Sequence, residues 1–98
     1  MIHLNRENFE KETSSGLKLI LFSAQWCGYC HKQKAVLEEM KDIWVGEIDS
    51  DESPEITERF GIMSFPTFVV LNQGKAVGKF VGLHNKSELL KQLMKFVN

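Results

Sequence analysis

Residues 17–23, with the sequence Leu-Lys-Leu-Ile-Leu-Phe-Ser, constrain the fold more than any other segment of this chain. Residues 19–22 are all apolar, without the alternation of apolar and polar side chains that marks a strand with one wet face. A strand of this kind is buried on both sides, so other elements must cover both faces of its sheet. The apolar stretch is also far too short to cross a bilayer.

Patterns on either side of this segment supply the remaining strands and the helices. Further strands are expected at residues 2–4, 43–49, 67–71 and 76–81. Helical patterns occupy residues 6–13, the stretch from the turn at 26–29 to about residue 41, the stretch that starts at 53–55, and the stretch after residue 85. Residues 72–75, Asn-Gln-Gly-Lys, are typical of a hairpin turn. The predicted fold class is α/β, with a mixed central sheet flanked by helices on both faces in the order βαβαββα.

Capping residues mark the ends of these helices. Asn5 is expected to cap the first helix, and Ser53, which is followed by proline, is a strong start for the third. Gly61 suits the left-handed residue that follows a helix. Asn85 and Glu88 have the spacing of a capping box. The second and last helices carry apolar stripes that we expect to be buried, namely Val36, Leu37 and Met40 in one and Leu89, Leu90, Leu93, Met94 and Val97 in the other.

The chain has two cysteines, Cys27 and Cys30, at the point where the central strand gives way to a helix. Cys27 is then expected at the helix N-terminus, where unpaired backbone N–H groups and the positive end of the helix dipole favour the nucleophilic thiolate. Cys30 lies one turn further along and can reach back to resolve a mixed disulfide. A bridge between them closes too short a loop to stabilise the fold much. Gly28 is expected to let this turn approach another backbone closely.

This segment resembles the active site of the thioredoxin family, and the resemblance covers nearly the whole chain. It rests on four motifs, which are Trp26-Cys27-Gly28-Tyr29-Cys30 after an apolar strand, Phe65-Pro66-Thr67 before a strand, Gly74 in the hairpin, and Val81-Gly82-Leu83 before the last helix. The resemblance implies a thioredoxin-like fold, a nucleophilic Cys27, a resolving Cys30 and a cis Phe65–Pro66 bond beside the dithiol. The residues that it implies for the border of a substrate groove are Trp26, Gly28, Tyr29, Phe65, Pro66, Gly82 and Leu83.

The function implied by this resemblance is that of a thiol–disulfide oxidoreductase, an electron carrier that reduces protein disulfides and contributes to cell redox homeostasis. Its partners would be disulfide-containing proteins and a thioredoxin reductase that supplies electrons from NADPH, with no cofactor or metal bound to the chain itself. The formal net charge of -1 gives no reason to expect a nucleic-acid partner. The first residues lack the basic segment and apolar run of a signal peptide. We therefore expect a monomeric, cytoplasmic protein with a single thioredoxin domain over residues 1–98.

Four positions depart from the usual pattern of the family. Tyr29 stands where these proteins have proline, so it adds a backbone N–H near Cys27 and should make the protein more oxidising. Leu21 stands where the family buries an aspartate, and Val45 is expected where that aspartate has a lysine partner. Ala35 replaces a proline that commonly kinks the helix, which should make this helix straighter.

Other functions remain open at this point. Cys-Gly-Tyr-Cys-His also resembles the centre of periplasmic disulfide isomerases, whereas the Thr-Val-Pro and Gly-Gly motifs of glutaredoxins are not found. A binding module that needs no thiols is a third possibility. A structural zinc site would require four ligands, and only His3, His31 and His84 are available besides the cysteines. We expect His31 to be a solvated helix residue, with tuning of a thiol as the alternative.

Overall fold

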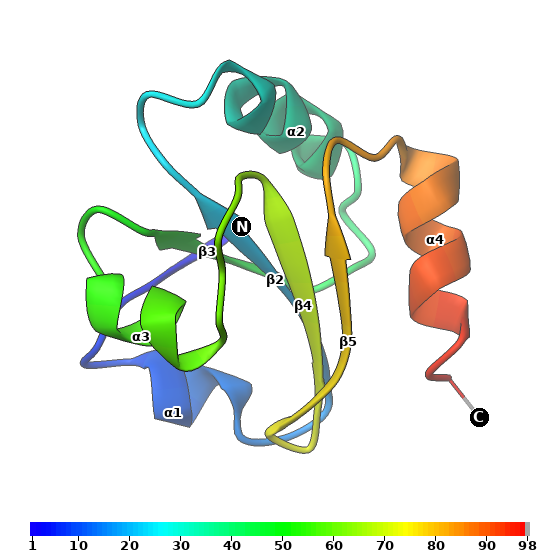
Figure 1. The fold of residues 1–98 in the computed structure, drawn as a ribbon. Coiled ribbons are helices and arrows are strands. Elements are labelled where there is room, and N and C mark those ends of the chain that lie inside the picture. The colour runs from blue at the N-terminus through cyan, green and yellow to red at the C-terminus, as the bar shows by residue number, and fades with distance from the viewer. Residues whose placement is uncertain (98) are drawn as a thin grey trace.

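A five-stranded sheet runs through the middle of the molecule, with its strands in the order β1-β3-β2-β4-β5 (Figure 1). The strands are β1 (Ile2–Leu4), β2 (Leu17–Ser23), β3 (Val45–Asp49), β4 (Thr67–Asn72) and β5 (Lys75–Val81). β3 pairs in parallel with β1 and β2, whereas β4 pairs antiparallel with β2 and β5. The coordinates are a computed structural model, which describes residues 1–97. The predicted mixed sheet is confirmed.

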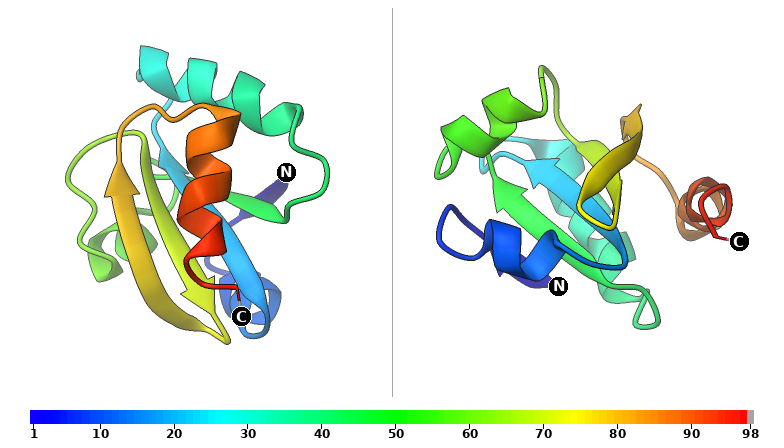
Figure 2. Two further views of the ribbon diagram at one scale, coloured as in Figure 1. Left: turned by 90° about the vertical axis from the view of Figure 1, so that its right-hand side faces the viewer. Right: turned by 90° about the horizontal axis from the view of Figure 1, so that it is seen from below.

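Four helices cover the two faces of this sheet (Figure 2). They are α1 (Phe9–Thr13), α2 (Gly28–Glu38), α3 (Pro54–Arg59) and α4 (Lys86–Met94). Side chains of α1 and α3 join one core, and side chains of α2 and α4 join the other. The fold class is therefore as predicted. The order of elements is βαβαβαββα, one strand–helix unit longer than the expected βαβαββα, although the residue patterns marked all of these segments.

The central strand β2 explains why its sequence is apolar without alternation. Leu19 and Leu21 point into the core under α2 and α4, and Ile20 and Phe22 point into the core under α1 and α3. All four side chains are almost completely buried. Because a strand turns successive side chains to opposite faces, residues 19–22, which have a core on each side, offer no solvent-facing position for a polar residue.

Several boundaries differ from the predicted ones for local reasons. α1 begins at Phe9 rather than at residue 6, because Asn5 and Asn8 first form a separate turn. In that turn the Asn5 side chain accepts the Asn8 N–H at 3.1 Å, and the Asn8 side chain accepts the Asn5 N–H at 2.8 Å. α2 stops at Glu38 rather than near residue 41, and β3 starts at Val45 rather than at residue 43.

The hairpin turn and the two ends of α3 lie at the residues that the sequence predicted for them. β4 and β5 extend one residue further into the hairpin than expected, and the turn uses positive φ angles of 53° at Gln73 and 82° at Gly74. Two consecutive positive φ angles suit the right-handed twist of a two-residue hairpin. Pro54 opens α3, although the Ser53 side chain makes no capping hydrogen bond, and Gly61 has the predicted left-handed conformation with φ of 66°.

The apolar stripe of α4 is only partly buried, which corrects the prediction. The capping box of Asn85 and Glu88 is present, and Leu89 and Leu93 lie in the core. In contrast, three of the expected core residues are exposed, namely Leu90, Met94 and Val97. These side chains border an open apolar cleft of about 280 Å³ together with Leu17 and Trp44. In the stripe of α2, Leu37 and Met40 are buried and Val36 is half-buried.

Candidate active site

Cys27 is the residue that caps the N-terminus of α2. Its backbone is extended, with φ of -90° and ψ of 110°, and its Sγ accepts a hydrogen bond from the Cys30 N–H at 3.2 Å. The Cys27 N–H donates to the Ala24 carbonyl at 3.1 Å, which closes the turn after β2. The N-cap position directs a side-chain acceptor at the unpaired N–H groups of the first helical turn. The sulfur of Cys27 thus occupies the place predicted from the sequence.

The two thiols differ in access. Both are free, but Cys27 has 6% of its surface exposed and Cys30 has none. An incoming sulfur atom therefore reaches Cys27 first, because Cys30 lies behind it in the first turn of α2. This asymmetry allows one cysteine to meet substrate and the other to act only on the product of that encounter.

The surroundings of Cys30 strongly favour its protonated form. Burial and a hydrogen bond with Cys27, helped by the charge of the Cys27 sulfur, raise the pKa of Cys30 from 9.0 to about 12. A hydrogen bond with the Ala24 backbone and the charge of Lys34 act in the opposite direction, but they are weaker. Cys30 is therefore a thiol at neutral pH, and it must lose a proton before it can attack.

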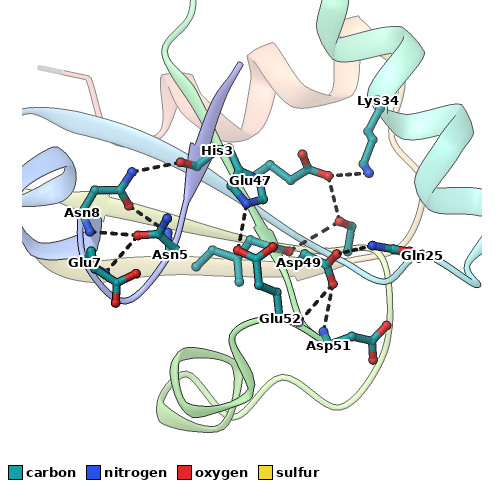
Figure 3. Close-up of polar contacts among 12 residues, drawn as sticks. His3, Asn5, Glu7, Asn8, Gln25, Lys34, Glu47, Asp49, Asp51 and Glu52 are labelled. Atoms are coloured by element: carbon teal, nitrogen blue, oxygen red, sulfur yellow. Dashed lines mark hydrogen bonds and ion pairs between the residues drawn. The ribbon is translucent and has the colours of Figure 1, made fainter.

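A half-buried ion pair lies between α2, the helix that begins at the dithiol, and the sheet. Lys34, one turn after Cys30 in α2, pairs with Glu47 of β3 (Figure 3). The Ser23 hydroxyl donates to the Glu47 carboxylate at 3.0 Å. The strand register places Glu47 beside Leu21 and places Val45 beside Leu19. Val45 and Leu21 belong to the same core, but the residue directly beside Leu21 is the charged Glu47, which only the pairing of β2 with β3 determines.

A second polar group ties the loop before Cys27 to the end of β3. Gln25 donates to Asp49 at 3.0 Å (Figure 3). Burial alone would raise the pKa of Asp49, but this bond and two backbone N–H bonds outweigh it and hold that pKa below its ordinary value.

The His31 ring nitrogen Nε2 is 3.1 Å from the Gln25 carbonyl, to which it donates. His31 is exposed, as predicted, and this contact directs its ring to the loop backbone.

The predicted cis bond at Phe65–Pro66 is present, and it lies beside the dithiol. Phe65 packs against the small cluster formed by Ala24 and the two cysteines. Trp26 is 73% exposed, and its ring meets the Phe65 ring edge-on with 5.7 Å between centroids. The Gly82 N–H donates to the Pro66 carbonyl at 2.9 Å, so the loop before β4 and the loop before α4 lie side by side.

Three other residues predicted for the groove are exposed to solvent. Tyr29 and Leu83 are exposed, and the Tyr29 ring lies 5.6 Å from the Lys32 ammonium group. Gly28 is also exposed, and a Cβ built there would meet no atom within 4 Å. The expected close approach of another backbone at Gly28 is therefore wrong, because the turn faces open space. Gly82, with φ of 100°, is the glycine in this region whose backbone disfavours a side chain.

Sequence reasoning missed two polar groups near the dithiol. One is the ion pair of Lys34 and Glu47, for which the position of Lys34 four residues after Cys30 was an available signal. The other is Gln33, a completely buried amide whose side chain bonds to the backbone of His84. A polar residue among the apolar positions of α2 was the only sign of it. Its partner is distant in the sequence, so no local pattern could identify that partner.

Neither a metal-binding cluster nor a membrane-spanning helix is found within residues 1–97. No group of three or more His, Cys, Asp or Glu side chains in this part of the chain lies close enough to hold a metal ion. Among the same residues, no helix has the length and apolar character required to cross a membrane.

Comparisons with known proteins agree with this geometry. The sequence model of the family described as Thioredoxin matches residues 1–95. Thioredoxin of Chlamydia trachomatis is 38% identical over 96 residues, which cover 94% of each chain, and thioredoxin of Listeria monocytogenes is 39% identical over 94 residues, which cover 91% of each. A mutant thioredoxin from Halobacterium salinarum has a similar structure, with a TM-score of 0.89 at 24% identity, over 99% of this chain and 90% of that one. That structural likeness concerns the fold.

Proposed function

The chain belongs to the thioredoxin family and is a thiol–disulfide oxidoreductase, and we propose that it reduces protein disulfides with Cys27 as the nucleophile and Cys30 as the resolving thiol. One observation carries this assignment of roles. The Cys27 sulfur caps α2 and accepts the Cys30 N–H at 3.2 Å, so the backbone of the helix start stabilises negative charge on that sulfur. Cys30 is buried behind it and has no such access to a substrate.

The reaction divides into two exchanges. The Cys27 thiolate attacks one sulfur of the substrate disulfide, a new S–S bond forms, and the second substrate sulfur leaves as a thiolate that takes up a proton. Cys30 then loses its proton and attacks the Cys27 sulfur. This step forms the Cys27–Cys30 disulfide and releases the first substrate sulfur as a thiol. Two electrons have passed from the two cysteines to the substrate, with one proton from Cys30 and one from water, which replaces the proton that Cys27 lost on ionisation.

The raised pKa of Cys30 fits the second role. A thiol with a pKa of about 12 stays protonated while the first exchange takes place, so it does not compete with Cys27 for substrate. Once Cys27 is in a mixed disulfide, its negative charge is gone and the hydrogen bond that held the Cys30 proton is weakened. Both causes that depend on Cys27 then fall away, and Cys30 becomes easier to ionise.

The surface around Cys27 supports binding of an extended segment of the substrate protein. Trp26, Phe65, Pro66, Gly82 and Leu83, with Gly28 and Tyr29 at the start of α2, would border this groove. Exposed aromatic side chains such as Trp26 are typical of binding surfaces. Backbone groups of the Phe65 and Gly82 loops would pair with the substrate main chain and give affinity with little sequence preference.

The remaining parts of the proposal come from the family. A thioredoxin reductase, itself supplied by NADPH, would return electrons to the Cys27–Cys30 disulfide, and no bound cofactor would take part. The protein would act as a cytoplasmic monomer with one domain over residues 1–98 and would serve electron transport and redox homeostasis in the cell.

Insulin reduction by the wild type and two cysteine variants tests this proposal. The wild type, kept reduced by dithiothreitol, should reduce insulin, Cys27→Ser should lose this activity, and Cys30→Ser should accumulate a covalent adduct with insulin. Mass spectrometry under non-reducing conditions detects the adduct. Adducts on Cys27→Ser instead would reverse the roles, and a wild type that does not reduce insulin would refute the function. A second assay with NADPH and a thioredoxin reductase in place of dithiothreitol tests the source of electrons.

A further inference from the structure

Gln33 is a completely buried amide on α2, three residues after Cys30. Both ends of its side chain bond to the backbone of a single distant residue. The Gln33 Oε1 accepts the His84 N–H at 2.8 Å, and the Gln33 Nε2 donates to the His84 carbonyl at 2.9 Å. A side-chain amide that satisfies both groups of one backbone residue fixes that residue in position and in orientation.

The contacts continue from His84 to the two loops beside the dithiol. The His84 ring nitrogen Nδ1 lies 2.7 Å from the Gly82 carbonyl, and because a carbonyl only accepts, Nδ1 carries the hydrogen and donates. The Gly82 N–H in turn donates to the Pro66 carbonyl at 2.9 Å. One path of hydrogen bonds thus runs from the helix that carries Cys27 to both loops.

The surroundings of this path are apolar. The His84 ring packs edge-on against Phe80, with centroids 5.0 Å apart, and against Phe68, with centroids 6.3 Å apart. His84 is half-buried, whereas Gln33 is completely buried, so a Gln33 amide without its partner would stay unpaired, and this costs more than the net gain from a hydrogen bond in water. An apolar residue at position 33 could fill the same space. What the amide adds is a fixed placement of His84 relative to α2.

We propose that Gln33 and His84 are positioning residues that hold the Gly82 and Pro66 loops at a set distance from Cys27, so that a peptide segment can dock beside the dithiol. The inference rests on the proposed function, because it concerns the groove of that same site. Neither residue acts on sulfur in this role. Their loss should therefore weaken the binding of peptide substrates and leave the thiol chemistry unchanged.

Gln33→Met tests this prediction, since methionine has nearly the same length and volume but makes neither bond. The KM for insulin, measured with dithiothreitol as the reductant, should rise about three- to tenfold, as expected for one or two lost hydrogen bonds. The rate with cystamine, a small disulfide that needs no groove, should change by less than about twofold. Gln92→Met is the matched control on α4, because the Gln92 side chain accepts from the exposed Lys95 side chain and lies away from both loops; both rates should equal those of the wild type.

Two variants of His84 keep the test decisive if Gln33→Met does not fold. His84→Leu removes the donor to the Gly82 carbonyl, whereas the side-chain amide in His84→Asn can place a donor near the position of Nδ1. His84→Leu should raise the KM for insulin, and His84→Asn should restore at least half of the loss. Hydrogen exchange adds a direct readout, because the Gly82 N–H should exchange faster in His84→Leu than in His84→Asn.

The possible outcomes separate the two hypotheses. If the wild type reduces insulin and the KM is unchanged in Gln33→Met or in His84→Leu, the positioning role is wrong while the proposed function stands. If the cystamine rate falls as much as insulin reduction, the residues act on the thiols or on the fold, and the inference fails. If the wild type itself does not reduce insulin, the proposed function fails first.

Discussion

The two faces of the sheet bury their polar side chains in different ways. Under α1 and α3, the hydroxyls of Thr13 and Thr57 donate to carbonyls four residues earlier, at 2.7 and 3.1 Å. On the α2 and α4 face, Gln33 bonds to His84 across 51 positions of sequence, and Lys34 pairs with Glu47 on another element. The first kind of bond stays within one helix, whereas the second kind joins separate elements.

This difference indicates that the two faces of the sheet contribute differently to stability and to the site. A bond within a helix satisfies a buried group wherever that helix lies, so the α1–α3 core can be held together by apolar packing alone. A bond between elements fixes their relative position, which a site built from α2, β3 and two loops requires. The dithiol lies on the face with the long-range bonds. We therefore expect changes on the α1–α3 face to alter stability alone, and changes on the α2–α4 face to alter stability together with chemistry or binding.

Phe9→Ala gives the largest expected effect and tests the first half of this comparison. Phe9 is buried in α1 and its ring lies 5.7 Å from that of Phe60, so the substitution leaves a cavity on the face without the dithiol. The free energy of unfolding should fall by about 3–5 kcal/mol. The rate of alkylation of Cys27, measured where both proteins are folded, should stay the same. A lower alkylation rate would show that the two faces are coupled.

Leu21→Asp should have the next largest effect, and it tests the α2–α4 face. The new carboxyl would be buried beside Glu47, so burial and a like charge would both raise its pKa in the folded state. Stability should be greatest at low pH and should fall as the pH rises above about 4, by about 1.4 kcal/mol for each pH unit until the folded-state pKa is passed. Leu21→Asn is the neutral control, and equal pH profiles for the two variants would contradict the prediction.

The raised pKa of Cys30 predicts a smaller dependence of stability on pH in the reduced protein. Above pH 9.0 the unfolded chain ionises this thiol while the folded chain, with a pKa of about 12, keeps it protonated. The free energy of unfolding should therefore fall from pH 9 upward, by at most about 1.4 kcal/mol per pH unit. Cys30→Ala should lack this contribution. Denaturant titrations of both proteins in a reducing buffer measure the difference, and parallel profiles would refute it.

Tyr29→Pro should have the smallest effect. Tyr29 is the second residue of α2, and its N–H is one of the donors at the helix start that can favour negative charge on Cys27. Proline removes this donor and fits the first helical turn without breaking it. The reduced form should lose stability, and the reduction potential should become more negative by about 30 mV, a tenfold change in the equilibrium. Equilibration with glutathione measures it, and a potential that is unchanged or less negative would contradict the prediction.

Local sequence determined much of this molecule. The apolar run of β2, the capping box of α4 and the hairpin turn at Gln73 and Gly74 each formed where their residues predict. The position of Cys27 at the start of α2 also follows from the strand that precedes it. These features depend on interactions within a few residues, namely side-chain periodicity, capping and backbone preference, and all of these can be read from a short window.

The tertiary structure determined which side chains from different elements are neighbours. The register of β2 and β3 puts Glu47 directly beside Leu21, and a shift of two residues would leave the apolar pattern nearly unchanged, so the sequence alone did not identify this neighbour. Likewise, α4 buries Leu89 and Leu93 but leaves Met94 exposed, although its helical spacing predicted burial. The pairing of Gln33 with His84 exists only because the chain returns past α2. Periodicity assigns a residue to a face, but only packing chooses its neighbour, and the environment of the dithiol consists of such neighbours.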